Sequence, residues 1–429
     1  MDGRASSLTI TDKIPYLLDA GIKPYVFSAI TGIKDNRFPH KQLIAWGPAA
    51  FRFDFRHWVA NHYGRGLCYK FSTGLVSLLL APFIALEKLF LGYTSQWSWA
   101  MPAYVHGLRL IRGGEVDLIY STGGAWSAHL AGLWLKKKTG LPWIAEIHDP
   151  LVIRSSPNDP GFDKPKNRDA QFRQYLEKQI CKYADLVWWF TDGALHYAKV
   201  RNPNLNTLHN AHGFVVTPGA EPPGSLDANQ SHQYTEQLNL CHFGSLANDR
   251  SLSTILKALV PLLKKYPEAR EQIRVHAYGA PLDSLSLDAI KQLGFEDVLL
   301  AHGRLERDPH TGKSGRERIS EKMQAADILI LLHGNDEWCA EYIPSKFYDY
   351  LWTGRPIWGI THRNPQLDKM LLDRGAYLSP QLDPDEVELS LERIWLDWKG
   401  KRLIEPAWNP IGVDQAVNTI LIQVQNRPK

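Results

Sequence analysis

The segment from Ala340 to Ile360, "AEYIPSKFYDYLWTGRPIWGI", combines several groups that can bind an anion. Pro344 suits the first position of a helix, where the free amides of the first turn attract phosphate. Lys346 adds a positive charge in that turn, and Asp349 follows Ser345 by four residues on the same helix face. A carboxylate there could accept hydrogen bonds from a ribose diol. The spacing therefore predicts a site for phosphate beside a sugar.

The elements around this segment would place it at one edge of a parallel sheet. "ADILILLH" (Ala326–His333) is a continuous apolar run, which is typical of a strand buried on both faces, and ligands bind just beyond such strands. Glu341 lies between this strand and the helix, and Gly354 with Pro356 ends the helix and begins the next strand. Taken singly, each residue also fits a capped surface helix whose charges face water. Their combination favours a ligand site.

The whole run resembles the nucleotide-sugar motif of family 4 glycosyltransferases, which have the GT-B fold. In that family two acidic residues, separated by seven others, flank a "PSK" and an aromatic-rich helix that ends in "G-x-P". The acidic residues of this chain are Glu341 and Asp349, and the second is most often Glu in the family. The resemblance implies that Pro344, Ser345, Lys346 and Asp349 bind the donor and that Glu341 contacts the transferred sugar.

A second segment that matches the family is "EIHDPLV" (Glu146–Val152). It resembles the strand end at which the family keeps a His or Arg before an acidic residue and Pro. The match implies that His148 contacts the transferred sugar. Considered alone, a His before Asp-Pro is more often a turn residue.

A third matching segment is "CHFGSLANDRS" (Cys241–Ser251), which resembles the glycine loop after the first strand of the donor-binding domain. The family frequently has Arg next to that glycine, Gly244 here, and Lys five residues later. This chain has Ser245 and Arg250 at these positions, so one of the two cations is missing. Arg250 could hold phosphate oxygens bidentately and partly compensate for the loss.

Two further glycines follow expected strands, Gly279 and Gly303. The resemblance places Gly303 where the backbone meets the nucleotide base, and it assigns no function to Gly279. Each glycine, considered singly, is also compatible with an ordinary tight turn.

Length and composition bound the class of protein. At 429 residues the chain can form two α/β domains of about 200 residues each. Lys plus Arg exceeds Asp plus Glu by 49 − 45 = 4, which gives no electrostatic argument for binding nucleic acid. The four cysteines lie far apart without metal-ligand spacing, and "MDGRASSLTI" lacks the features of a signal peptide. We therefore expect a reduced cytoplasmic protein without structural zinc.

The order of expected elements predicts two Rossmann-like, doubly wound domains that face a cleft. The polar, Pro- and Gly-rich run from Thr217 to Gln233 marks the connector. We place an acceptor-side domain at 1–225, a nucleotide-sugar-binding domain at 235–405, and at 406–429 a closing helix, which in GT-B proteins returns to the first domain. The first domain opens with a helix (Ser7–Asp19) rather than a strand, so we expect its first strand to lie upstream of Met1 or to be absent.

The segment 51–91 is basic and aromatic at first and then uncharged from Phe71 to Leu86, with Pro82 inside the uncharged run. Sixteen uncharged residues fall short of the ~20 that a spanning helix needs. We expect a helical pair, either buried against the first domain or lying on an anionic membrane surface. The cations that favour the membrane, against the single acidic Asp54 before Phe71, are Arg52, Arg56, Arg65 and Lys70.

The resemblance implies a retaining glycosyltransferase that moves a sugar from a nucleotide diphosphate to an acceptor hydroxyl. The acceptor would be a glycan or a lipid-linked glycan of surface polysaccharide synthesis, and the enzyme would work in the cytoplasm, either free or on the inner face of the cytoplasmic membrane. No Asp-x-Asp metal motif is evident, so Arg250, Lys346 and helix amides would stabilise the leaving diphosphate. We expect no metal and no cofactor beside the donor. Two alternatives remain, a nucleotide-sugar epimerase of the same fold and a non-catalytic GT-B binding scaffold.

Overall fold

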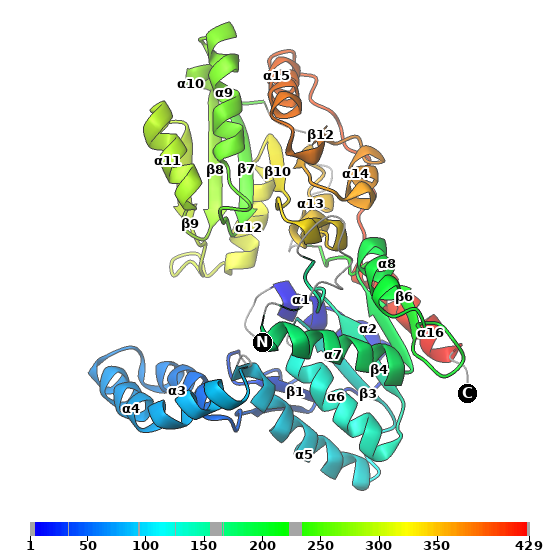
Figure 1. Ribbon diagram of the computed structural model, residues 1–429. Helices are drawn as coiled ribbons and strands as arrows, with labels where there is room; N and C mark the ends of the chain where they lie inside the picture. The colour runs from blue at the N-terminus through cyan, green and yellow to red at the C-terminus, as the bar shows by residue number, and fades with distance from the viewer. Residues whose placement is uncertain are drawn as a thin grey trace. The chain divides into compact units, whose positions relative to one another are not determined.

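The computed structural model divides the chain into two compact units. The first comprises Met1–Pro218 with Val413–Lys429, and the second comprises Gly219–Gly412. The structure describes residues 5–32, 34–92, 95–124, 126–154, 165, 167–222 and 234–426 (Figure 1).

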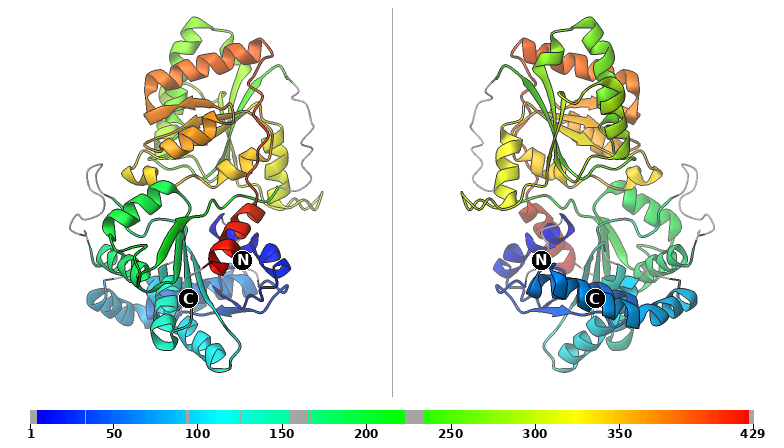
Figure 2. Two further views of the ribbon diagram at one scale, coloured as in Figure 1. Left: turned by 90° about the vertical axis from the view of Figure 1, so that its right-hand side faces the viewer. Right: turned by 90° about the vertical axis from the view of Figure 1, so that its left-hand side faces the viewer.

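The main sheet of the first unit has four parallel strands in the order β3-β4-β5-β6. They are β3 (Ile119–Gly123), β4 (Trp143–Ile147), β5 (Leu186–Trp189) and β6 (His212–Val215). The helices between them are α6 (Trp126–Thr139), α7 (Arg168–Tyr183) and α8 (Asp192–Arg201). Every residue of β4 and β5 is buried, because helices cover both faces of a parallel sheet. α16 (Val413–Gln425) packs Ala416 and Ile420 against β4 and β5 (Figure 2).

The first unit opens with two short helices where the sequence predicts one. α1 (Ala5–Thr11) and α2 (Ile14–Asp19) are separated at Asp12 and Lys13, and the Lys13 side chain is buried. β1 (Val26–Ala29) then pairs in parallel with β2 (His40–Leu43) in a separate two-stranded sheet. The break between the helices matters because it turns Lys13 into the interior of the unit.

A helical hairpin follows, formed by α3 (Pro48–Tyr63) and α4 (Leu67–Phe90). η1 (Ser95–Trp99) and α5 (Ala100–Arg112) then lead to β3. The expectation that the uncharged run is too short to span a membrane is corrected, because α4 has 24 residues, continues through Pro82 and is long and apolar enough to cross one. The alternative of burial against the domain is wrong, because only 11% of its most apolar window is buried.

The second unit contains six parallel strands in the order β12-β11-β10-β7-β8-β9. They are β7 (Leu238–Gly244), β8 (Ile273–Gly279), β9 (Leu299–Gly303), β10 (Ile328–Leu332), β11 (Ile357–Ile360) and β12 (Tyr377–Ser379). The chain runs outward from β7 to β9 and then returns to the other side of β7 at β10. The order therefore reverses between β7 and β10, which is the usual ligand position in doubly wound sheets.

Helices cover both faces of this sheet (Figures 1 and 2). α9 (Ser253–Lys265), α11 (Ser284–Leu293) and α15 (Pro384–Lys399) share one core with Ile328, Ile330 and Leu332 of β10. α12 (Gly315–Gln324), α13 (Lys346–Leu351) and α14 (Pro365–Leu372) share the other with Leu329 and Leu331. The short elements are α10 (Ala269–Gln272), η2 (Glu337–Glu341) and η3 (Pro380–Leu382). Alternate residues of β10 thus point to opposite faces, as a strand buried on both sides requires.

Candidate functional site

The ends of β7 and β10 lie side by side where the strand order reverses. Lys346 of α13 reaches across to β7, where its Nζ lies 3.2 Å from His242 Nε2. A Cβ added to Gly244, at the end of β7, would lie 3.3 Å from the same Nζ. Sequence elements about a hundred residues apart therefore meet at this edge of the sheet.

Two glycines make this close approach possible. Gly244 has φ +115° and Gly279, at the end of β8, has φ +136°, a region that side chains with a Cβ rarely adopt. A Cβ on Gly279 would lie 2.3 Å from the carbonyl oxygen of Gly244. Gly279, for which the sequence offers no function, is thus needed to pack β8 against the glycine loop.

Two cations converge at the glycine loop. Burial and the neighbouring Arg250 guanidinium lower the pKa of Lys346 to about 7. Arg250 is held by a backbone pair with Ala247, with N–O distances of 2.8 and 3.2 Å, and its Nε is buried without a hydrogen-bond partner. An anionic ligand would stabilise the charged form of this lysine and accept a hydrogen bond from the unused arginine donor. The arrangement can bind the phosphates of a nucleotide diphosphate.

The loop that carries Glu341 is fixed from both sides. Asn364 Nδ2 donates hydrogen bonds of 2.7 Å to the carbonyl oxygen of Tyr342 and 2.9 Å to that of Cys339. His333 Nε2 lies 3.2 Å from the same Tyr342 carbonyl, and the Tyr342 hydroxyl accepts from the amide of Gly334 at 3.1 Å. Glu341 itself is 2% exposed at the end of η2. These contacts preorganise the backbone on either side of the carboxylate.

The helix after this loop is shorter than the sequence predicts. α13 begins at Lys346 rather than Pro344, its N-cap residue is Ser345, and it ends at Leu351. Pro344 lies in the turn that precedes the helix, where its carbonyl accepts from the amide of Phe347 at 2.9 Å. The helix has only six residues, so its dipole is small. The positive charge available to an anion therefore comes mainly from Lys346 and Arg250.

The other residues expected to bind the donor lie around this centre. Ser245 is exposed directly after Gly244, and Asp349 is partly buried in α13. Gly303 has φ +67° and lies at the carboxyl end of β9, the outermost strand, two strands from β7. The structure thus brings Gly244, Arg250 and Lys346 together and places Gly303 further along the same edge.

In the first unit, His148 belongs to a polar cluster centred on the buried Glu146 (0% exposed). Lys13 Nζ and the Tyr120 hydroxyl both donate to the Glu146 carboxylate. Thr122 Oγ1 lies 2.9 Å from Glu146 Oε2 and 3.1 Å from His148 Nε2, and His148 Nε2 lies 3.3 Å from Glu146 Oε1. These contacts, with the Phe190 ring 4.7 Å from the His148 ring, fix the imidazole in one orientation.

The electrostatics of this cluster keep Glu146 ionised. Burial alone would raise the pKa of Glu146, but Lys13 and His148 outweigh that effect and hold the pKa well below its usual range. No sequence motif marks Glu146 as a partner of His148, although the two residues are two positions apart at the end of β4, a spacing that places both side chains on one face. No sequence signal indicates Lys13, which is 133 residues away along the chain.

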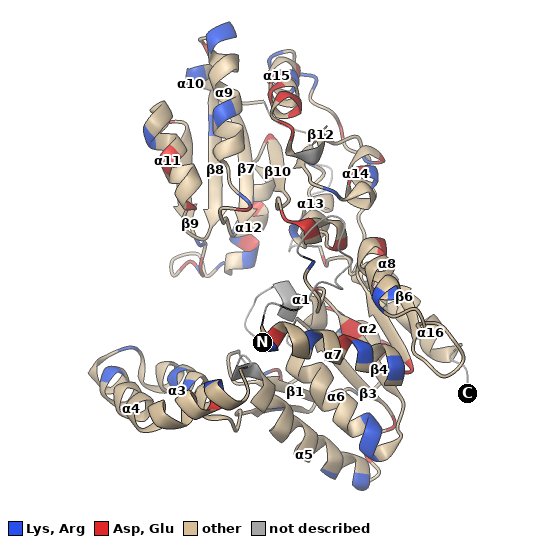
Figure 3. Ribbon diagram, in the orientation of Figure 1, with Lys and Arg blue, Asp and Glu red and all other residues tan. Residues whose placement is uncertain are grey.

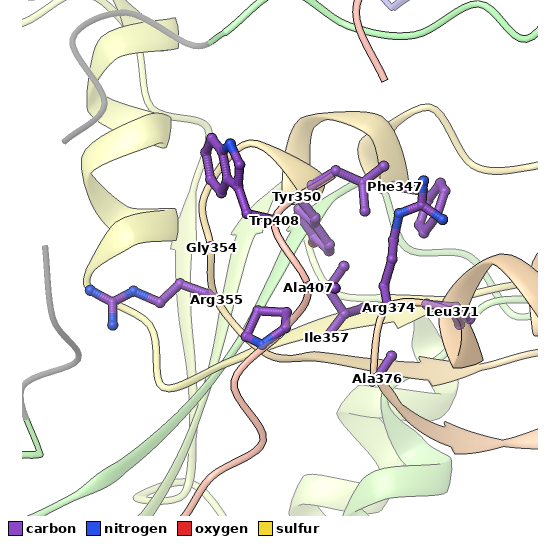
Figure 4. A pocket seen from close by; sticks show the side chains of 12 residues that line it. Phe347, Tyr350, Gly354, Arg355, Ile357, Leu371, Arg374, Ala376, Ala407 and Trp408 are labelled. Atoms are coloured by element: carbon purple, nitrogen blue, oxygen red, sulfur yellow. The ribbon is translucent and has the colours of Figure 1, made fainter. Parts of the chain in front are cut away.

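A small cavity lies on a different side of α13 (Figure 4). Phe347, Tyr350, Arg374 and Trp408 are among the residues that line it, and the Arg374 guanidinium lies 5.9 Å from the centre of the Phe347 ring. Its volume of about 10 Å³ has room for one water molecule. This cavity is too small for a nucleotide sugar. It is a packing feature of the core that α13 and α14 share with β10.

Comparison with known proteins gives a structural likeness only. No protein-family model matches the chain, and no curated protein matches its sequence. Its fold is similar to that of an alpha,alpha-trehalose 6-phosphate synthase from Burkholderia multivorans, with a TM-score of 0.51 and 10% identity over 77% of this chain and 76% of that chain. A structure described as trehalose-6-phosphate from E. coli bound with UDP-2-fluoro glucose has a TM-score of 0.50 and 14% identity, over 77% of this chain and 75% of that chain. TarM has a TM-score of 0.50 and 11% identity, over 76% of this chain and 58% of that chain. The chain has an α/β fold of the GT-B type, with two Rossmann-like units.

Proposed function

We propose that this protein is a family 4 glycosyltransferase that transfers a sugar, with retention and without a metal, from a nucleotide diphosphate to an acceptor hydroxyl. The observation that carries the proposal is the convergence of Lys346 and Arg250 on the glycine loop, at the reversal of strand order. Two cations at this position of a GT-B fold suit a diphosphate leaving group.

The proposed chemistry follows from the charge that develops when the glycosidic bond to the diphosphate breaks. Lys346 and Arg250 stabilise the growing negative charge on the leaving phosphate. Glu341 binds hydroxyls of the sugar and supports the positive charge at the anomeric carbon. The resemblance of the segment around His148 assigns sugar contact to this residue as well, and within the first unit Glu146 positions the His148 ring. The leaving phosphate accepts the proton of the acceptor hydroxyl, so no separate protein base is assigned.

Binding of nucleotide diphosphates tests the proposal directly. Lys346→Ala and Arg250→Ala should each weaken the binding of UDP, GDP, ADP or TDP, whichever the protein prefers, by ~1.5 to 3 kcal/mol, because each removes a charged hydrogen bond. Thermal shift identifies the nucleotide, and calorimetry measures the affinities. The matched control is Lys369→Ala, which removes an exposed lysine that pairs with Asp373. Wild-type affinity in both site variants would contradict the assignment.

The reaction class is tested by the release of free nucleotide from the preferred nucleotide sugar. A glycosyltransferase releases nucleotide faster when glycan or lipid-linked acceptors are added. An epimerase converts the sugar without an acceptor, and a binding scaffold releases no nucleotide in either case. Either of these results would overturn the proposed transfer.

A further inference from the structure

The hairpin of α3 and α4 presents an apolar surface that the first unit does not cover. Leu67, Phe71, Leu78, Leu89 and Phe90 of α4 are each at least 70% exposed. Over its most apolar 18-residue window the helix has a mean hydropathy of 1.7, and only 11% of that window is buried. Helices of water-soluble proteins turn such a surface toward a core.

The inner side of α4 is less apolar than its outer side. Thr73 is buried, and its hydroxyl donates to the carbonyl of Tyr69 at 2.6 Å, while Ser72 donates to the carbonyl of Cys68 at 2.7 Å. Ile84 is the other buried residue of this helix. Side-chain hydroxyls therefore face inward or bond to the helix itself, whereas most large aliphatic and aromatic side chains face outward. This polarity suits a helix whose outer face contacts lipid.

The charges of the hairpin are also arranged for an anionic surface. Its cations, which Figure 3 marks in blue, are Arg52, Arg56, Arg65, Lys70 and Lys88. Asp54 and Glu87 are the acidic residues between 48 and 92, and both turn toward the unit. Asp54 accepts from the amide of Ala45 at 2.8 Å, and Glu87 accepts from the amide of Ala49 at 3.0 Å and from Trp97 Nε1 at 2.9 Å.

The two lysines of α4 flank its apolar surface. They are 88 − 70 = 18 residues apart, which is about five helical turns, so both lie on one line along the helix. Lysines at such an edge can extend to lipid headgroups while their stems cover apolar surface. Trp46, Phe53 and Tyr63, each more than half exposed, add aromatic rings of the kind that favour the membrane–water interface.

We propose that the hairpin 48–90 docks on a bilayer that contains anionic lipids, with α4 lying along the surface and its outer face at the boundary between headgroups and acyl chains. The C-terminal end of α4 is held to the first unit, because Arg168 donates to the carbonyls of Leu89 and Phe90. The turn at 64–66 joins its other end to α3, which is held through Asp54 and the amide of Ala45. α4 therefore lies on the membrane and does not cross it. A symmetric contact with a second copy would bring like charges together, which favours lipid as the occupant.

Flotation of the full chain with vesicles tests this docking. We expect binding to vesicles of phosphatidylglycerol and phosphatidylcholine at low salt, a large loss of binding at high salt, and little binding to phosphatidylcholine alone. Leu78→Ser with Leu79→Ser should weaken binding at least tenfold, as should Arg56→Gln with Lys70→Gln. The matched controls are Leu208→Ser, a leucine off the hairpin that is more exposed than Leu78 and Leu79, and Lys138→Gln with Lys178→Gln.

The cysteines allow a direct readout of insertion. Cys68, at the start of α4, is exposed, whereas Cys181, Cys241 and Cys339 are buried. An environment-sensitive fluorophore on Cys68 should shift to shorter wavelength with anionic vesicles and should not shift with neutral ones. Absence of binding to anionic vesicles at low salt, or hairpin variants that bind like the controls, would overturn the proposal. A dimer in solution that Leu78→Ser with Leu79→Ser converts to monomer would overturn it too and assign the surface to a second copy. The test of nucleotide binding is independent, so none of these outcomes bears on the proposed glycosyl transfer.

Discussion

The two polar clusters of this protein differ in how their charges are balanced. In the first unit, the buried Glu146 is paired with Lys13 and receives further hydrogen bonds from Tyr120 and Thr122. In the second unit, the charged neighbour of Lys346 is another cation, Arg250. The first cluster is satisfied within the protein, whereas the second carries excess positive charge.

This difference separates positioning from binding. A satisfied network such as that of Glu146 holds its members in one geometry and gains little from a ligand. Two neighbouring cations, one a lysine with a lowered pKa and the other an arginine with an unused donor, cost free energy in the absence of a bound anion. We therefore expect loss of the Glu146–Lys13 pair to change mainly stability, and mutations in the second cluster to change ligand binding or turnover.

The largest effect should come from breaking the balanced cluster. Glu146→Gln leaves the Lys13 charge buried without its counterion and should lower the free energy of unfolding by ~3 to 5 kcal/mol. Denaturant unfolding measures the change. Glu392→Gln, which breaks the exposed pair with Lys265, is the control and should leave the unfolding transition nearly unchanged. A Glu146 variant as stable as this control would show that the cluster is not a buried ion pair in solution.

The same variant should change the acid dependence of stability. The folded-state pKa of Glu146 is depressed, so its contribution is present above the usual carboxyl pKa of ~4.3 and is lost as the pH falls below that value. Unfolding free energies between pH 3 and pH 7 should therefore fall less steeply with acid in Glu146→Gln than in the wild type. Parallel curves would contradict the depressed pKa.

The next largest effect concerns the carboxylate of the second unit. Glu341→Gln keeps the size of the side chain and should keep donor binding, but it weakens a contact that matters in the transition state. Turnover should fall at least ~100-fold, or ~2.7 kcal/mol. Steady-state kinetics with calorimetry for the donor separate the two quantities, and Glu388→Gln on the exposed face of α15 serves as control. An unchanged rate would remove Glu341 from the site.

A smaller effect should follow from the lowered pKa of Lys346. An anion binds the protonated amine, and the pKa in the free protein is about 7, so affinity for nucleoside diphosphate should fall by up to ~10-fold per pH unit above pH 7. Calorimetry at pH 8 in buffers of different ionisation enthalpy should show proton uptake. Lys346→Arg should retain binding but lose both the uptake and this pH dependence, and persistence of uptake would assign it to another group.

The smallest expected effect is that of chelation. Because Lys346 and Arg250 are proposed to stabilise the leaving diphosphate, excess EDTA should leave activity largely intact and added magnesium or manganese should not be required. Initial rates with and without chelator decide the point. Loss of activity that metal restores would mean that the two cations do not suffice.

Part of this structure could be predicted from local patterns of sequence. The apolar run before His333 becomes the buried β10, and Gly354 with Pro356 separates α13 from β11 as expected. The sequence predicts a start of α13 at Pro344, two residues before the observed start at Lys346, because boundary signals do not define the first residue of a helix. The sequence alone does not decide whether 71–86 is buried, because an apolar run has the same composition whether it faces a core or the outside.

By itself the sequence determined the α/β class, because periodicity and glycine positions are properties of neighbouring residues. It also predicts the site residues Glu341, Lys346, Arg250 and His148, and their roles stay predictions. Only the tertiary structure decided that Lys346 reaches His242 and that Lys13 pairs with Glu146. It also decided that α4 turns its large apolar side chains outward. These contacts join residues more than a hundred positions apart, or depend on which face of a helix is covered, and such information exists only after the chain has packed.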